Sequence, residues 1–176
     1  MGLIALLVTL SAAACGGGSQ GGSSGADSAS AVSAEPSAEF MGQHGNNSFA
    51  RYGELAPAEE REAASHVLER NLRSRAAGDW SAQCATLTKA VVDEIEERAR
   101  LLQIDEGCAL DLKAEAEPVP KSVRADTLNG PIDVLRIDGN EAYALYHGKH
   151  GLDYAMPMKK EDGVWKVASE VTVRIP

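Results

Sequence analysis

The sequence predicts an α+β domain whose N-terminal helices pack on a curved antiparallel sheet, preceded by a signal peptide and a flexible linker. Apolar residues recur at helical spacing from Pro57 up to Gly107, and they alternate with polar residues in much of the chain beyond. Helices followed by strands are typical of the α+β class. Before Pro57 the chain lacks both patterns. We therefore expect a signal peptide (1–14), a linker (15–55) and one α+β domain (56–176).

Three helices are expected first. Pro57 is suited to a helix start, and Gly78 is suited to a helix end because glycine tolerates a left-handed conformation. Asp79 then caps a short second helix over 80–87. A third helix is expected over 89–103. Its inward residues are predicted to be Val91, Val92, Ile95, Ala99 and Leu102.

The predicted sheet begins where apolar and charged residues alternate over 110–116. Pro118 and Pro120 interrupt that strand. Two hairpin turns are indicated by Asp138-Gly139-Asn140-Glu141 and by Glu161-Asp162-Gly163. The remaining predicted strands are 122–128, 132–137, 142–147, 152–160 and 164–174.

The chain of 176 residues has a formal net charge of -9, which disfavours binding to nucleic-acid phosphates unless a basic patch exists. Arg70, Arg73 and Arg75 lie among glutamates on the first predicted helix, and we interpret them as an exposed helical face. Nucleic acid is therefore not an expected partner.

A short apolar run ends in small residues before Cys15. It is shorter than the roughly 20 residues that a membrane-spanning helix needs, but it suits the core of a signal peptide. Ala13-Ala14-Cys15 resembles the bacterial lipobox. The resemblance implies cleavage before Cys15, lipidation of its thiol and anchorage at the outer face of the cell membrane. An ordinary secretory signal cut near Ala14, with Cys15 left free, is the alternative.

The linker after Cys15 is rich in Gly, Ser and Ala, which have little surface to bury. Two interpretations stay open for its last part, 40–55, where apolar residues reappear. It is either continued linker or a segment loosely docked on the domain. The apolar residues are Phe40, Met41, Phe49, Tyr52 and Leu55.

The folded part resembles an NTF2-like (cystatin-like α+β) domain of the kind carried by small lipoproteins of high-GC Gram-positive bacteria. The resemblance covers 57–176. It depends on Ala76-Ala77-Gly78-Asp79-Trp80, Cys84, Cys108 and Glu161-Asp162-Gly163-Val164-Trp165-Lys166-Val167. It implies a cone-shaped sheet with a pocket between sheet and helices. Because isomerases, dehydratases, transport adaptors and other proteins share this fold, it does not define an activity.

Cys84 and Cys108 are expected to form a disulfide, because an even pair of cysteines in an exported protein is typically oxidised. The alternatives are a reactive thiol or a metal pair, but metal-binding cysteines usually lie a few residues apart and need further ligands. His147, His150 and Asp153 could bind a metal, although an exposed hairpin connection explains them more simply.

The candidate pocket-lining residues are Trp80, Tyr143, Tyr146 and Tyr154. Alternation along a strand places Tyr143 and Tyr146 on opposite faces. No set of catalytic residues, no cofactor site and no metal site is predicted.

Three functions are consistent with these residues. The first is a non-catalytic module that binds a small apolar ligand in the cone or an envelope protein over the sheet. The second is an isomerase or dehydratase that uses Tyr or Asp side chains, such as Asp153, in the cone. The third is a structural accessory of an envelope complex. The expected partners are the membrane, through the lipid, and a small apolar ligand or an envelope protein.

Overall fold

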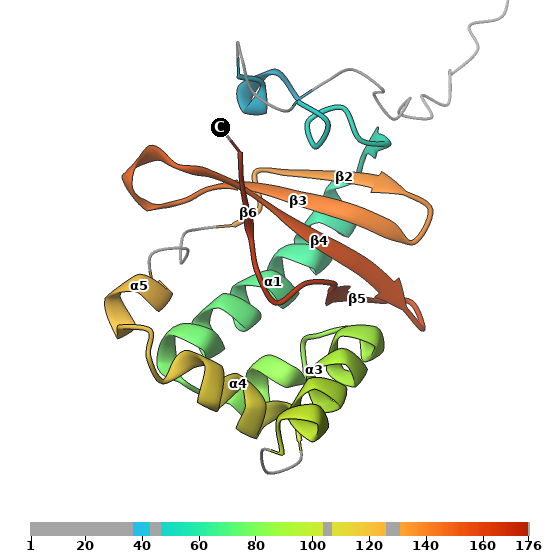
Figure 1. Cartoon of the computed structure of the whole chain (residues 1–176). Coiled ribbons are helices and arrows are strands. Elements are labelled where there is room, and N and C mark those ends of the chain that lie inside the picture. The colour runs from blue at the N-terminus through green and yellow to red at the C-terminus, as the bar shows by residue number, and fades with distance from the viewer. Residues whose placement is uncertain (1–36, 43–46, 104–106, 126–130, 176) are drawn as a thin grey trace, which may run out of the picture. The chain divides into compact units, whose positions relative to one another are not determined.

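A computed structural model describes residues 37–42, 47–103, 107–125 and 131–175, which belong to one compact unit, Val32–Pro176 (Figure 1). The predicted signal peptide, Cys15 and the start of the predicted linker lie outside the described residues. The class is α+β, as the sequence predicts: helices pack against a six-stranded antiparallel sheet.

The helices precede most of the strands. They are α1 (Ala58–Ala77), α2 (Trp80–Cys84), α3 (Lys89–Leu102), α4 (Cys108–Ala116) and α5 (Lys121–Ala125), with 3-10 turns η1 (Ala38–Phe40) and η2 (Lys149–Gly151). The strands are β1 (Glu54–Leu55), β2 (Val134–Asp138), β3 (Glu141–His147), β4 (Asp153–Glu161), β5 (Val164–Val167) and β6 (Val173–Ile175).

The sheet has the order β1-β2-β3-β4-β5, and β6 pairs with another part of β4. Both predicted hairpin turns are confirmed. Asp162 and Gly163 have positive φ angles of 50° and 79°, the signature of a type I′ turn between β4 and β5. Gly139, with φ of 60°, lies in the turn between β2 and β3.

The predicted helix boundaries around Gly78 are confirmed. Gly78 adopts a left-handed conformation with φ of 79°, and its N–H donates to carbonyls of the last turn of α1. The side chain of Asp79 then accepts a hydrogen bond of 3.0 Å from the Ala82 N–H and caps α2. These two residues set the direction in which α2 leaves α1.

The strand predicted over 110–116 is wrong, because this segment forms α4. Alternation would bury Leu110 and expose Asp111, yet Leu110 is 45% exposed and Asp111 is 0% exposed. The buried residues are Cys108, Asp111 and Leu112, whose spacing is helical. Because the charged Asp111 lies on the buried face, the apolar residues of this segment did not follow a helical spacing in the sequence.

Three further expectations need correction. The weak strand predicted over 122–128 is replaced over 121–125 by α5, and its remainder lies outside the described residues. The strand predicted over 164–174 is divided into β5 and β6 by the irregular segment 168–172. Leu102, expected to face inward, is 62% exposed because α3 ends there.

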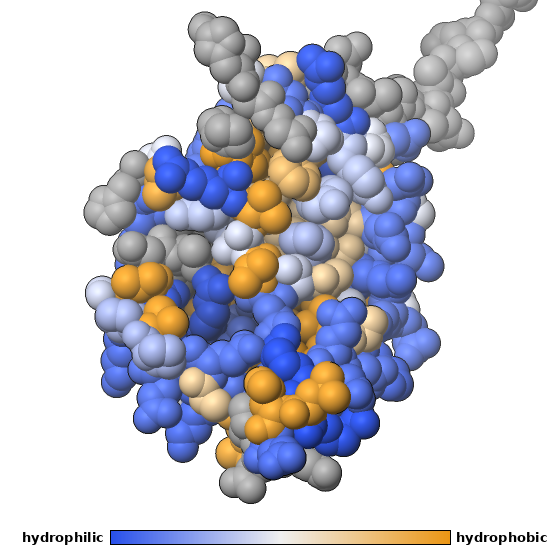
Figure 2. Space-filling view, in the orientation of Figure 1, coloured by the Kyte–Doolittle hydropathy of each residue, from blue (hydrophilic) through white to orange (hydrophobic). Residues whose placement is uncertain are grey.

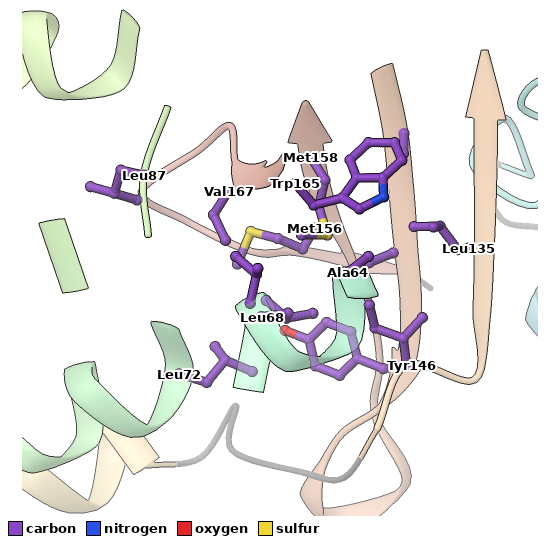
Figure 3. Close-up of a cluster of buried hydrophobic side chains, with 14 of the residues drawn as sticks. Ala64, Leu68, Leu72, Leu87, Leu135, Tyr146, Met156, Met158, Trp165 and Val167 are labelled. Carbon is purple, nitrogen blue, oxygen red and sulfur yellow. The ribbon is translucent and has the colours of Figure 1, made fainter. Parts of the chain in front are cut away.

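The main core lies between α1 and one face of the sheet (Figure 3). It includes Ala64, Leu68 and Leu72 from α1 and Tyr146, Met156, Met158, Trp165 and Val167 from the sheet. The indole N–H of Trp165 donates to Glu60 on α1 at 2.7 Å. Trp165 therefore ties the sheet to α1 by both packing and a hydrogen bond.

The other face of the sheet is covered by the lead-in segment, which we define as residues 37–42 and 47–55. Phe40 and Ala50 pack there with Val134, Leu145, Ala155 and Ile175. Buried Arg136 on β2 donates hydrogen bonds of 2.7 Å to the carbonyls of Tyr52 and Gly53. Of the two alternatives for 40–55, the structure supports the docked one, so the folded part begins before residue 56.

The disulfide between Cys84 and Cys108 is present. Its Cα atoms are 6.2 Å apart, within the usual range for such a bridge. It joins the end of α2 to the start of α4, and the enclosed loop contains all of α3. The bridge thereby holds three of the helices that surround the candidate site.

Candidate functional site

An open pocket of about 730 Å³ lies between the helices and the segment 168–172 that connects β5 to β6. Its volume is within the range of small-molecule sites. The apolar lining residues are Val91, Leu112, Ala116, Val119, Val123, Ala168 and Val171. The polar and aromatic ones are Arg75, Trp80, Gln83, Glu94, Arg98, Glu115, Arg124, Ser169, Glu170 and Thr172. Figure 2 shows that apolar and charged side chains are interspersed on the helical part of the molecule.

The end of the pocket near α3 and α4 is organised by Arg98. Its guanidinium donates two hydrogen bonds to Glu170, of 3.0 and 2.9 Å, in a bidentate arrangement. It also contacts Asp111 at 2.9 Å and Glu115 at 2.9 Å. Because Glu170 lies in the segment 168–172, Arg98 fixes that segment against α3.

These contacts shift the pKa values of the cluster. The hydrogen bond with Glu170 is the largest influence on the pKa of Arg98 and raises it, so Arg98 stays charged. Burial raises the pKa of Glu115, and the nearby carboxylates Glu170 and Asp111 raise it further, against the opposing effect of Arg98. Three carboxylates around one guanidinium leave this end of the pocket with an excess of negative charge.

The opposite end of the pocket carries Arg75, Arg124 and Trp80. The guanidinium carbon of Arg124 lies 5.2 Å from the Trp80 ring centroid, a cation–π contact. Burial lowers the pKa of Arg75, and Tyr146 and Tyr154 oppose this effect. The sequence analysis interpreted Arg70, Arg73 and Arg75 as one exposed helical face. Arg70 and Arg73 are exposed, but Arg75 is partly buried and lines the pocket.

Gln83 is the most deeply buried polar residue of the lining, with 2% of its surface exposed. Its side-chain oxygen Oε1 has no hydrogen-bond partner among the described residues. The backbone carbonyl of Gln83 accepts from the Thr86 hydroxyl at 2.6 Å, which helps to fix the end of α2. Since buried polar atoms are normally paired, this unpartnered oxygen is a candidate position for a hydrogen bond from a ligand.

Of the four predicted pocket residues, the structure places Trp80 in the pocket. Tyr146 and Tyr154 are buried in the main core instead, with ring centroids 5.6 Å apart. Burial raises the pKa of Tyr146 to about 12, so its hydroxyl is neutral. Tyr143 packs on the other face against Phe49 and Tyr52, in agreement with the predicted alternation.

Sequence reasoning missed Gln83, Arg98 and Arg124, and it placed Arg75 at the surface. A signal for Arg75 was present, because it continues the helical stripe of Leu68 and Leu72 at positions i, i+4 and i+7. Arg98 gave no such signal, because its partner Glu170 is 72 positions away.

The predicted histidine region lies apart from the pocket residues in the fold. His147 Nδ1 is 2.7 Å from Asp153 Oδ1, and the His147 ring stacks on Phe40 with centroids 4.8 Å apart. The hydrogen bond to Asp153 raises the pKa of His147. His44 and the side chain of His150 lie outside the described residues. Within the described ranges, no three His, Cys, Asp or Glu side chains are grouped so that they could hold a metal ion.

Among the described residues, no helix has the length and apolar character needed to cross a membrane. Comparison with known proteins found no matching family model, no matching curated protein and no matching solved structure. The pocket itself is therefore the basis for a proposed function.

Proposed function

We propose that this protein is an extracytoplasmic lipoprotein whose NTF2-like domain binds a small, largely apolar ligand without catalysing a reaction. In this proposal, a lipid on Cys15 anchors the chain to the outer face of the cell membrane. The apolar run and small residues before Cys15 support export, and the Gly- and Ser-rich stretch after it supports a tether. The Cys84–Cys108 disulfide is consistent with an oxidising compartment.

The pocket between the helices and the segment 168–172 is the observation that carries the binding function. It has the volume of a small-molecule site, a wall of aliphatic side chains and a deeply buried polar atom in Gln83. Ligand sites commonly combine a mostly apolar lining with a few polar groups that orient the ligand. Its surrounding elements are fixed by the disulfide and by Arg98.

Filling the pocket tests this function. Ala116 lines the pocket from α4, whereas Ala114 on the same helix is exposed and lies outside the lining. Ligands from an apolar library should raise the melting temperature of the wild type and of Ala114→Phe. They should have no such effect on Ala116→Phe. A wild type that no library member stabilises, or equal stabilisation of both variants, would contradict binding in this pocket.

The membrane anchor is tested separately, by the mass of the mature N-terminus isolated from cells. The proposal expects a chain that begins at Cys15 and carries a diacylglyceryl group. An unmodified Cys15 would support the alternative of an ordinary secretory signal, and it would leave the pocket proposal unaffected.

An isomerase- or dehydratase-like enzyme is the second candidate. One observation favours it: Glu115 lines the pocket and its pKa is raised by burial, as in many general acids. The salt bridge of 2.9 Å from Arg98 favours the charged form instead. Recovery of a bound ligand after prolonged incubation distinguishes the two. Unchanged ligand supports the binding module, whereas conversion that is lost in Glu115→Gln supports the enzyme.

A further inference from the structure

We infer that the ligand is an uncharged amphiphile whose hydroxyl group donates a hydrogen bond to Oε1 of Gln83. This inference rests on the proposed binding function of the pocket and specifies the chemistry of its ligand. It follows from three properties of the lining: its balance of charge, its unpartnered polar atoms and the position of its aliphatic side chains.

The balance of charge disfavours an ionic ligand. Three arginines and three glutamates line the pocket. At one end Arg98 is already engaged by Asp111, Glu115 and Glu170, so an incoming anion would have to displace a carboxylate. The carboxylates at that end would repel an anion, and Arg75 and Arg124 at the other end would repel a cation, so a ligand with a single charge of either sign is opposed at one end of the pocket. The net charge of -9 on the chain adds further repulsion for anions.

The unpartnered polar atoms favour a hydroxyl group. Gln83 Oε1 is a buried acceptor and Arg124 Nε is a buried donor. Neither atom has a hydrogen-bond partner among the described residues. Each loses its hydrogen bonds to water without receiving a replacement, which is costly. A ligand O–H can donate to the acceptor, and its oxygen can also accept. An ether oxygen cannot donate, and therefore cannot satisfy Gln83.

The aliphatic wall accounts for the rest of the ligand. Val119 and Val123 come from the region of α5, and Val171 comes from the segment 168–172 on another side of the pocket. An alkyl body between these side chains would be removed from water, which is favourable in proportion to its apolar area. The polar group would then be directed to the buried Gln83.

Four probes that share a straight eight-carbon chain and differ in its end group test this inference on the full chain: 1-octanol, 1-methoxyoctane, octanoate and octyltrimethylammonium. Titration calorimetry of the wild type should give the tightest binding for octanol. We expect octanoate and octyltrimethylammonium to bind at least about tenfold more weakly, and the ether about tenfold more weakly, because it cannot donate to Gln83.

The variant Gln83→Met removes the acceptor and keeps a side chain of similar length. We expect the octanol-to-ether affinity ratio to fall from about tenfold to about one, with the ether bound as in the wild type. The matched control is Gln103→Met, because Gln103 is exposed at the end of α3 and outside the lining. A melting temperature for Gln83→Met at or above that of the wild type excludes misfolding as the cause.

The outcomes separate the inference from the function on which it rests. If none of the four probes binds, both the binding function and the inference are contradicted. Tighter binding of octanoate or octyltrimethylammonium than of octanol leaves the function standing and overturns the inference. Equal affinities for octanol and ether in the wild type, or an unchanged ratio in Gln83→Met, also overturn it.

Discussion

The face of the sheet that packs on α1 and the face that carries the lead-in segment are both buried, but by different means. The first is covered by a continuous core, next to helices joined by a disulfide and by the Arg98 cluster. The second is covered by a short segment with little regular structure, held by a few apolar residues and by Arg136. The comparison indicates that the helical side determines global stability, whereas the lead-in segment can detach locally.

Loss of the disulfide is expected to have the largest effect, because it acts on the helical side. Replacing both Cys84 and Cys108 with Ser should lower the free energy of unfolding by about 3–4 kcal/mol, through greater freedom of the unfolded chain. Urea denaturation measures this change. Adding a reductant to the wild type should reproduce it, and adding it to the double variant should have no further effect. A loss below about 1 kcal/mol would contradict a stabilising bridge.

Removal of Arg98 is expected to be nearly as damaging. Arg98→Met leaves Asp111 buried without its cationic partner and should cost about 3 kcal/mol at neutral pH. The control is Arg100→Met on the same helix, whose exposed ion pair with Glu97 is worth well under about 1 kcal/mol. Equal destabilisation of the two variants in urea would show that the Arg98 cluster does not support the fold.

A change at Arg136 tests the other side of the comparison. Arg136→Met removes the hydrogen bonds to the carbonyls of Tyr52 and Gly53 and should weaken docking of the lead-in segment by about 2 kcal/mol. Hydrogen exchange should accelerate in 47–55 and remain unchanged in α1. Exposed Arg174→Met on β6 serves as the control. Faster exchange throughout α1 would mean that the two faces unfold together.

The smallest effect is a pH dependence of stability through His147, whose ring stacks on Phe40 of the lead-in segment and whose Nδ1 lies 2.7 Å from Asp153 Oδ1 on β4. The pKa of His147 is raised, so the stabilisation from charged His147 is complete below the ordinary value near 6.5 and is lost as pH rises through the folded value. Because the side chain is 51% exposed, we expect less than about 1 kcal/mol. An NMR titration should show a lower His147 pKa in Asp153→Asn. Equal pKa values in the variant and the wild type would contradict this coupling.

Local patterns predicted those parts of the fold that depend on local interactions. Gly78 and the two hairpin turns act through their own backbone conformations, and Asp79 acts through a side-chain cap on the adjacent residues, so their residue types were sufficient. The helix α4 was missed because its buried face includes the charged Asp111, which is neutralised by a residue from another helix. The break at 168–172 was missed for a similar reason, because Glu170 bonds to Arg98 rather than to a neighbouring strand.

The candidate site was less accessible to sequence reasoning than the fold. Trp80 was among the predicted pocket residues and lies in the pocket, but the predicted tyrosines fill the core or the other face. Gln83 looked like an ordinary polar residue of a short helix. Gln83 is a candidate ligand contact because it is buried in a pocket that α3, α4 and the segment 168–172 also line. These elements are distant in sequence, so no local sequence pattern could predict that burial.

The disulfide also determines how the chain would respond to mechanical force. A protein held at one end and pulled at the other lengthens as its residues are drawn out, by roughly 3.5 Å for each residue. The bridge spans 24 positions, so while it remains oxidised the enclosed residues cannot extend, and the stretched chain is shorter by roughly 80 Å. All of α3 lies within this locked length and carries none of the load. Reduction would release that length, so the redox state of one cystine sets the distance over which the stretched chain can reach.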